Sequence, residues 1–205
     1  MNNSIYAPEN IKGKKTISIS TKTFVDNTTA SSAFLVAKSR LTNINQWHDF
    51  CTIEASRFSL VDDEGRRIAS HAQKGHFIRI DIPGPGNHIG EGLDWVQIQS
   101  IVEIQQQTQD LEIIVMTVKP CSNPTTSKND IAHFLSSTAS STFIVARQGS
   151  RVQAEVHGRN EIPNLKSGNF LTKLRNAAIG FGIFLGVSIF QWNLLTEGLL
   201  SDNKQ

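Results

Sequence analysis

The chain has 205 residues, of which 39% are hydrophobic and 19% charged, and its 20 Lys and Arg against 18 Asp and Glu give a net charge of +2. This length fits one domain with a sizeable core, and the composition excludes a disordered acidic tail or a fibrous repeat. The balanced charge argues against nucleic acid as a partner, because nucleic-acid-binding proteins usually carry a basic stripe.

The first fifteen residues are polar and lack the apolar core of a secretory signal. We therefore expect a disordered N-terminus over 1–15 and a cytoplasmic protein. The two cysteines, Cys51 and Cys121, have no C-x-x-C partner, so they are expected to be reduced thiols.

The next part of the chain predicts one strand and two short helices. Residues 16–25 are rich in Thr, Ile, Ser and Val, which is typical of a strand. Apolar residues at helical spacing predict a short helix over 31–41. A second short helix is expected over 45–50, with Trp47 and Phe50 on one side.

A run of strands joined by hairpins follows, predicted at 56–61, 66–69, 76–82, 94–105, 111–118, 140–147 and 151–157. Period-two alternation predicts the residues that face the core in two of these strands, namely Ile78, Ile80, Ile82, Val96, Ile98, Val102 and Ile104. The predicted fold class is α+β: a curved antiparallel sheet of about six to seven strands, two short N-terminal helices, and a long apolar C-terminal helix gripped by the sheet.

The C-terminal helix is expected over 168–200, followed by a tail at 201–205. Between Arg175 and Glu197 it contains 21 residues without a charge, NAAIGFGIFLGVSIFQWNLLT. Such a helix is buried on all sides or lies in lipid, and ~20 apolar residues are enough to cross a bilayer. A membrane anchor and a helix that closes the core both remain open.

This element order resembles the helix-grip fold of the START and Bet v 1-like superfamily, which includes polyketide cyclases and lipid-transfer domains. Two segments carry the resemblance: LTNINQWHDF at 41–50, which looks like the stretch of helix followed by Trp in these families, and FIVARQGSRVQAEVHGRNEIPN at 143–164, a hairpin that leads directly into the last helix. The resemblance covers roughly 16–195 and implies a single helix-grip domain over 16–200. It also implies an apolar cavity between sheet and helix that binds sterols, phospholipids, polyketides or plant hormones.

The sequence offers little support for an enzyme. Residues 84–90 have the look of a dinucleotide-binding loop, but a strand pattern follows where a helix would have to hold the phosphates. The six histidines are scattered over different elements without ligand spacing, so neither a metal site nor a cofactor is expected. No nucleophile motif is present in the sequence.

The predicted ligand pocket is apolar, and its residues are Trp47, Ile78, Ile80, Trp95, Val96, Ile98, Phe143, Phe181 and Phe184. His157 and Arg159 are the expected polar residues at the pocket mouth; the alternative is an ion pair of Arg159 with Glu161 that fixes the turn into the helix.

The predicted function is non-catalytic binding or transport of an apolar small molecule or lipid. One alternative is a membrane-tethered protein-interaction module anchored by helix 176–196. A second is a cyclase-like or hydrolase-like enzyme in the same cavity, which would need titratable residues facing inward. A homodimer is compatible with each of these functions.

Overall fold

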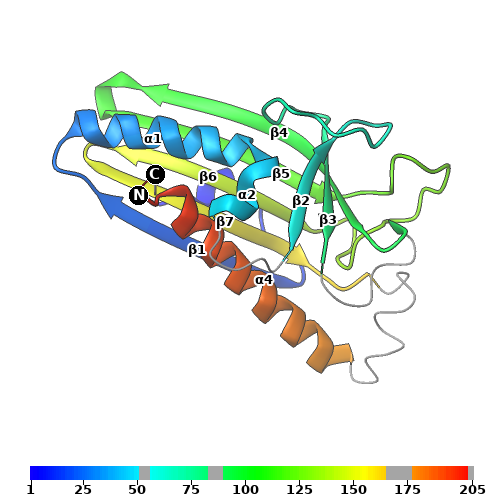
Figure 1. Cartoon of the computed structure of the whole chain (residues 1–205). Helices are drawn as coiled ribbons and strands as arrows, with labels where there is room; N and C mark the ends of the chain where they lie inside the picture. The colour runs from blue at the N-terminus through cyan, green and yellow to red at the C-terminus, as the bar shows by residue number, and fades with distance from the viewer. Residues whose placement is uncertain (51–55, 83–89, 165–176, 203–205) are drawn as a thin grey trace.

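The computed structural model describes residues 1–50, 56–82, 90–164 and 177–202 (Figure 1). In these ranges the fold is α+β, with one antiparallel sheet of seven strands and helices packed on one of its faces. The strands are β1 Lys14–Thr23, β2 Arg57–Val61, β3 Phe77–Asp81, β4 Asp94–Gln106, β5 Leu111–Pro120, β6 Ser140–Gln148 and β7 Arg151–Glu161. The α-helices are α1 Asn27–Thr42, α2 Trp47–Phe50 and α4 Ala177–Leu199, and the 3-10 turns are η1 Asn3–Tyr6, η2 Ile44–Gln46 and η4 Gln107–Gln109.

The strands follow one another in the order β1-β7-β6-β5-β4-β3-β2. Strands β2 to β7 are hairpin neighbours in sequence order, as the period-two pattern predicts, and β1 joins the far side of β7 with Ser18 opposite Val156. Residues 66–69 pair briefly with the end of the strand predicted at 56–61, through a bridge between Val61 and Arg67 and a hydrogen bond from the Ile68 N–H to the Leu60 carbonyl oxygen at 2.9 Å. They do not form a strand of their own, and β2 pairs along its length with β3.

Helix α1 is longer than the short helix predicted at 31–41. The side chain of Asp26 accepts a hydrogen bond from the Thr29 N–H at 2.7 Å, and this N-cap starts the helix at the next residue. The second predicted helix is divided into the turn η2 and the short α2. The number and lengths of the N-terminal helices therefore differ from the prediction.

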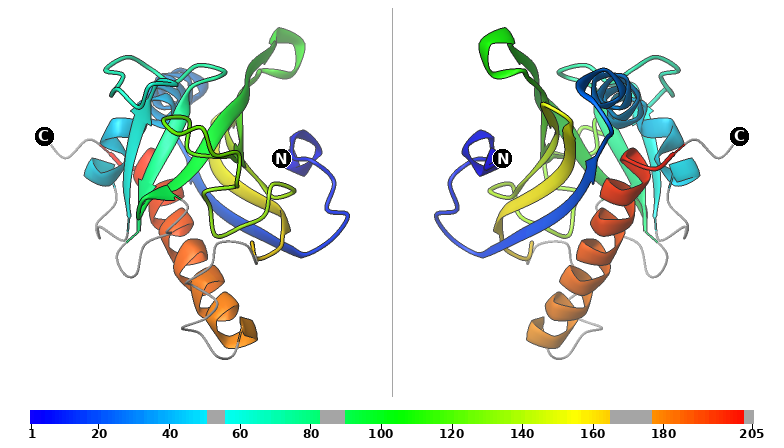
Figure 2. Two further views of the ribbon diagram at one scale, coloured as in Figure 1. Left: turned by 90° about the vertical axis from the view of Figure 1, so that its right-hand side faces the viewer. Right: turned by 90° about the vertical axis from the view of Figure 1, so that its left-hand side faces the viewer.

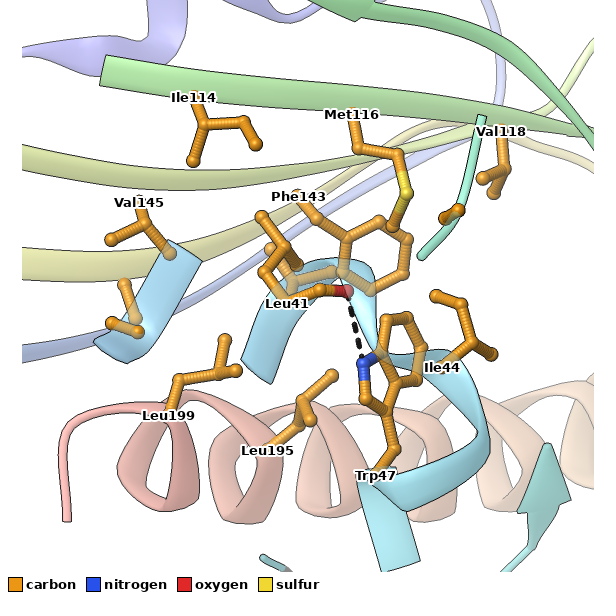
Figure 3. Packing of buried hydrophobic residues seen from close by; sticks show 14 of the residues in the cluster. Leu41, Ile44, Trp47, Ile114, Met116, Val118, Phe143, Val145, Leu195 and Leu199 are labelled. Atoms are coloured by element: carbon orange, nitrogen blue, oxygen red, sulfur yellow. Dashed lines mark hydrogen bonds between the residues drawn. The ribbon is translucent and has the colours of Figure 1, made fainter. Parts of the chain in front are cut away.

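The three helices cover the inner face of the sheet, whereas the N-terminal turn η1 lies on the opposite, outer face (Figure 2). The inner core includes Phe34 and Leu41 of α1, Trp47 of α2, Leu195 of α4 and Phe143 of the sheet. Figure 3 shows how Leu41, Trp47, Phe143 and Leu195 meet between the helices and the strands.

The first fifteen residues, expected to be a disordered N-terminus, lie within the described part of the chain. The Asn3 side-chain amide donates to Glu155 Oε1 at 2.6 Å on the outer face. Met1 and Tyr6 pack on the small outer cluster that includes Ile144. These contacts give the outer face a cover that the sequence did not predict.

A register shift in β4 changes which of its residues face the inner core. The pairing with β5 is irregular between Ile98 and Ser100, and such a bulge moves the following side chains to the other face. Ile101 therefore packs on the inner core, whereas Val102 is 47% exposed and Ile104 packs on the outer cluster. The prediction that these last two residues face inward is wrong for this reason.

Helix α4 lies along β1 and β7. In the stretch 186–199, where side chains are described, one side of the helix is buried and the other is exposed. Its buried side includes Leu195 and Leu199, while Val187 and Phe190 are 45% and 48% exposed. This stretch of the helix is therefore not buried on every side, and apolar side chains remain on its exposed side. Among the described residues, no helix is both long and apolar enough to span a membrane. The predicted helix start at 168 lies outside the described residues.

Candidate ligand-binding cavity

A partly open cavity of about 60 Å³ lies between the inner face of the sheet and helix α4. Most of its wall is apolar, and its hydrophobic lining residues are Trp47, Phe58, Ile78, Ile80, Ile82, Val96, Val118, Phe134, Leu135, Phe143, Val187 and Trp192. Alternate residues of β3 face the cavity because successive side chains of a strand point to opposite faces of the sheet. The cavity therefore lies where the helix-grip resemblance places one.

Four aromatic rings from different elements form one wall of this cavity. Trp47 lies 5.2 Å from Phe58 and 5.1 Å from Phe143, and Trp192 lies 5.8 Å and 5.3 Å from the same two rings, all measured between ring centroids. The indole N–H of Trp47 donates to the Leu41 carbonyl oxygen at 3.1 Å (Figure 3). Since edge and tilted contacts at these distances are favourable, this wall is expected to be rigid.

Five of the nine predicted pocket residues line the cavity, and these are Trp47, Ile78, Ile80, Val96 and Phe143. Ile98 is buried in the inner core but is not part of the cavity wall. Trp95 points to the outer face, where it packs with Val61 and Ala132, because it alternates with Val96 along β4. The side chains of Phe181 and Phe184 lie outside the described residues.

The predicted mouth residues, His157 and Arg159, do not line the cavity but are buried on the outer face of β7. Arg159 donates to His157 Nδ1 at 2.9 Å, and His157 Nε2 lies 2.6 Å from Glu155 Oε2. Glu155 in turn accepts from Asn3, so these four side chains form one hydrogen-bonded chain. His157 and Arg159 alternate along β7 in the same way as Glu155, so all three side chains point to the outer face, away from the cavity.

Two polar residues that the sequence did not indicate, His133 and Glu161, line the cavity instead. His133 Nδ1 accepts a hydrogen bond from the Leu135 N–H at 2.9 Å, which leaves the ring proton on Nε2. Burial lowers the pKa of His133 to about 3, an effect only partly offset by this hydrogen bond. His133 is therefore a neutral hydrogen-bond donor on the cavity wall.

Glu161 follows Asn160, whose φ of 54° breaks the alternation of β7. This backbone conformation turns Glu161 to the inner face, although residues 155, 157 and 159 point outward. Its Oε1 accepts a hydrogen bond from Thr16 Oγ1 at 3.1 Å. Burial raises the pKa of Glu161, and the Thr16 hydrogen bond and the attraction of Arg159 act in the opposite direction. Arg159 and Glu161 thus lie on opposite faces, which is not the predicted ion pair.

Other polar lining residues are Ser56, Ser141, Ser188 and Gln191. Within the described ranges, no three His, Cys, Asp or Glu side chains come together in a way that could hold a metal ion. The arrangement can therefore offer a ligand an apolar aromatic wall, one buried carboxyl group and one imidazole N–H.

The strand order and the helices on the inner face define a helix-grip domain, in agreement with the resemblance noted from the element order. No family model and no curated protein matches the sequence. Solved structures with a similar chain path include a hypothetical protein from Helicobacter pylori, with a TM-score of 0.44 and 8% identity over 88% of this chain and 89% of that one.

Norcoclaurine synthase from Thalictrum flavum, solved with dopamine and hydroxybenzaldehyde, has a TM-score of 0.34 and 9% identity over 93% of this chain and 90% of that one. A major latex-like protein from Panax ginseng has a TM-score of 0.34 and 8% identity over 87% of this chain and 97% of that one. Similarities at this level say nothing about what the present chain binds or catalyses.

Proposed function

We propose that this chain binds an apolar small molecule or lipid, without catalysis, in the cavity between the sheet and α4. The observation that carries the proposal is the cavity itself, whose wall is dominated by aromatic and branched aliphatic side chains. Transfer of an apolar ligand from water to such a wall is favourable, and ligand pockets are typically apolar with a few polar groups that fix orientation.

The size of the cavity limits what it can enclose. Pockets for drug-sized ligands occupy ~300–1,000 Å³, whereas this cavity measures about 60 Å³. It can therefore enclose only part of a ring or one end of a chain, since a cavity that holds a whole benzene measures ~150 Å³, and the rest of the ligand would extend through the open side. A lipid would place one end against the aromatic wall and leave the remainder outside.

The proposal is tested by extracting the natively purified protein with organic solvent and analysing the extract by mass spectrometry. We expect an apolar compound in near-stoichiometric amount. Tryptophan fluorescence should change when the emptied protein is titrated with that compound, because Trp47 and Trp192 line the cavity. A protein that carries no compound and whose fluorescence is unaffected by small apolar probes would contradict the proposal.

A matched pair of valines on β5 separates loss of binding from loss of stability. Val118 lines the cavity, whereas Val115 belongs to the outer cluster, and the two are 4% and 5% exposed. Val118→Phe and Val115→Phe should each cost about 1–3 kcal/mol through overpacking. Only Val118→Phe fills the cavity, so only this variant should purify without the bound compound.

A second candidate function, acid–base catalysis in the same cavity, is favoured by the two titratable side chains His133 and Glu161 on its wall. General acid–base catalysis requires such groups within hydrogen-bond reach of the reacting atoms. Incubation of the extracted compound with fresh protein tests this function. A change in its mass or chromatographic retention that Glu161→Gln abolishes would support an enzyme, and an unchanged mass and retention would leave simple binding.

The proposed place of action is the cytoplasm, with association to a membrane through α4 as the alternative. Val187 and Phe190 are about half exposed on this helix, and such apolar side chains favour an apolar partner. Fractionation of cells with an alkaline wash of the membranes tests the alternative. Retention in the washed pellet would support it, whereas a dimer free in solution would assign the exposed face to a second copy.

A further inference from the structure

We propose that Glu161 is the recognition residue of this cavity and that the ligand carries a hydrogen-bond-donating head, an amine or a hydroxyl, on its apolar body. This inference rests on the proposed binding function and adds to it the chemical class of the ligand. It comes from an unpartnered buried oxygen of a residue that lines the cavity.

Glu161 is a buried carboxyl group with one oxygen unpartnered. The residue is 4% exposed, and its Oε1 accepts from Thr16 Oγ1 at 3.1 Å. Its Oε2 has no hydrogen-bond partner among the described residues. Buried polar atoms in native proteins are hydrogen-bonded in the great majority of cases, and a buried acceptor left alone costs stability. A hydrogen-bond donor on the ligand would supply the partner that Oε2 lacks.

The outer face of the same strand provides an internal comparison. Glu155 is 3% exposed, but both of its oxygens have partners, Asn3 Nδ2 at 2.6 Å and His157 Nε2 at 2.6 Å. This glutamate of β7, which does not line the cavity, therefore has both oxygens hydrogen-bonded. The glutamate with a free oxygen is the one that lines the cavity.

The backbone around Glu161 is arranged for this orientation. Asn160 adopts a left-handed conformation with φ 54°, and its Oδ1 accepts from the N–H groups of Ile11 and Lys12 at 2.7 and 3.1 Å. A Cβ on Gly158 would lie 2.3 Å from Glu161 Oε1 and 2.2 Å from Thr16 Oγ1. Only glycine leaves room for the carboxyl group at this place.

His133, a hydrogen-bond donor, lines the same cavity as Glu161. The segment that contains His133 runs beside the end of β7, where Leu135 forms a bridge with Pro163 and the Ser136 N–H donates to the Ile162 carbonyl oxygen at 2.9 Å. A hydroxyl can donate to the carboxylate and also accept from an imidazole N–H, whereas an amine only donates. Both heads satisfy the free oxygen of Glu161, so experiment must separate them.

The test uses three probes of the same shape: benzylamine, benzyl alcohol and ethylbenzene. Their affinities for the wild-type protein and for Glu161→Gln are measured at pH 7 by titration of the tryptophan fluorescence. Gln keeps an oxygen for the Thr16 bond but replaces the free acceptor. We expect benzylamine or benzyl alcohol to bind at least about tenfold more weakly to the variant, the loss typical of a hydrogen bond to a charged group, while ethylbenzene binds both proteins equally.

The control is Glu155→Gln, which alters a buried glutamate of the same strand away from the cavity and should leave all three affinities unchanged. A readout on the wild-type protein needs no variant: the ¹³C resonance of the Glu161 carboxyl carbon should shift with a donor probe and not with ethylbenzene.

Equal weakening of all three probes in Glu161→Gln, or of none, would overturn the assignment of Glu161 while leaving cavity binding intact. Failure of every probe to bind either protein would instead overturn the proposed function, and this inference with it.

Discussion

The C-terminal end of α4 is held by a buried guanidinium group on α1. Arg40 is 9% exposed, and its Nη1 donates to the carbonyl oxygens of Gly198, Leu199 and Ser201 at 3.0, 3.2 and 2.7 Å. The last carbonyl groups of a helix lack partners within the helix, and a cation there interacts favourably with the helix dipole. Arg40→Met keeps the apolar stem and removes both contributions.

The expected loss is about 3 kcal/mol of unfolding free energy. A hydrogen bond from a charged donor contributes about 1.5–3 kcal/mol, and a cation at a partly buried helix end adds up to about 2 kcal/mol. One nitrogen shared among three oxygens gives less than three full bonds, and relief of the buried charge in the variant offsets part of the loss. With a urea m-value of about 2–3 kcal/mol/M, the midpoint should fall by about 1 M.

Lys22→Met is the matched control, because Lys22 reaches the same end of the molecule. Its ammonium lies 2.6 Å from Asp202, whose side chain is 89% exposed. Exposed ion pairs contribute about 0–1 kcal/mol, so this variant should unfold close to the wild-type midpoint. The urea midpoints of both variants are compared by monitoring their unfolding with circular dichroism. A midpoint for Arg40→Met no lower than that of Lys22→Met would refute the reasoning.

Three further predictions concern titration, reactivity and packing. The pKa of His133 is about 3 in the folded state and about 6.5 in the unfolded chain, so the free energy of unfolding falls as the pH drops below 6.5, by about 2 kcal/mol at pH 5. Urea unfolding at pH 7 and at pH 5 should therefore show a smaller fall in His133→Asn than in the wild-type protein. Burial raises the pKa of Cys121 to about 12, which leaves little reactive thiolate. In a Cys51→Ser variant, where Cys121 is the remaining thiol, iodoacetamide should react far more slowly with the native protein than with the urea-unfolded chain. Gly158→Ala should lower the melting temperature and break the Thr16–Glu161 hydrogen bond, because its Cβ would lie within 2.3 Å of both side chains; an unchanged melting temperature would contradict this.

The general architecture follows from periodicity and can be predicted from the sequence. The alternation in 76–82 places Ile78 and Ile80 inward, and the structure places both on the cavity wall. The hairpin signals around residue 149 and residues 106–110 predict the pairing of β6 with β7 and of β4 with β5, and the structure confirms both pairs. Hydrophobic patterns identify such elements because each strand has to turn an apolar face to the core.

The cavity's polar groups could not be predicted, because two backbone irregularities interrupt the regular alternation of inward-facing and outward-facing side chains. The bulge after Ile98 reverses the facing of the end of β4, and the left-handed Asn160 reverses it at the end of β7. Simple alternation assigns Glu161 to the same face as His157 and Arg159, which is the wrong face for the glutamate. The one available signal was the residue type at 160, since Asn adopts positive φ more readily than most residues.

The contacts of α4 separate the part that holds the helix from the part that lines the cavity. The helix end is held by Arg40, and Ser20 Oγ lies 2.9 Å from Thr196 Oγ1. The cavity is lined by Val187, Ser188, Gln191 and Trp192, which precede these contacts in the chain. Variants of Arg40 should therefore change stability with the lining residues in place, and Glu161→Gln should change the lining with the anchoring contacts in place. Stability and ligand recognition in this domain are for this reason separable by single substitutions.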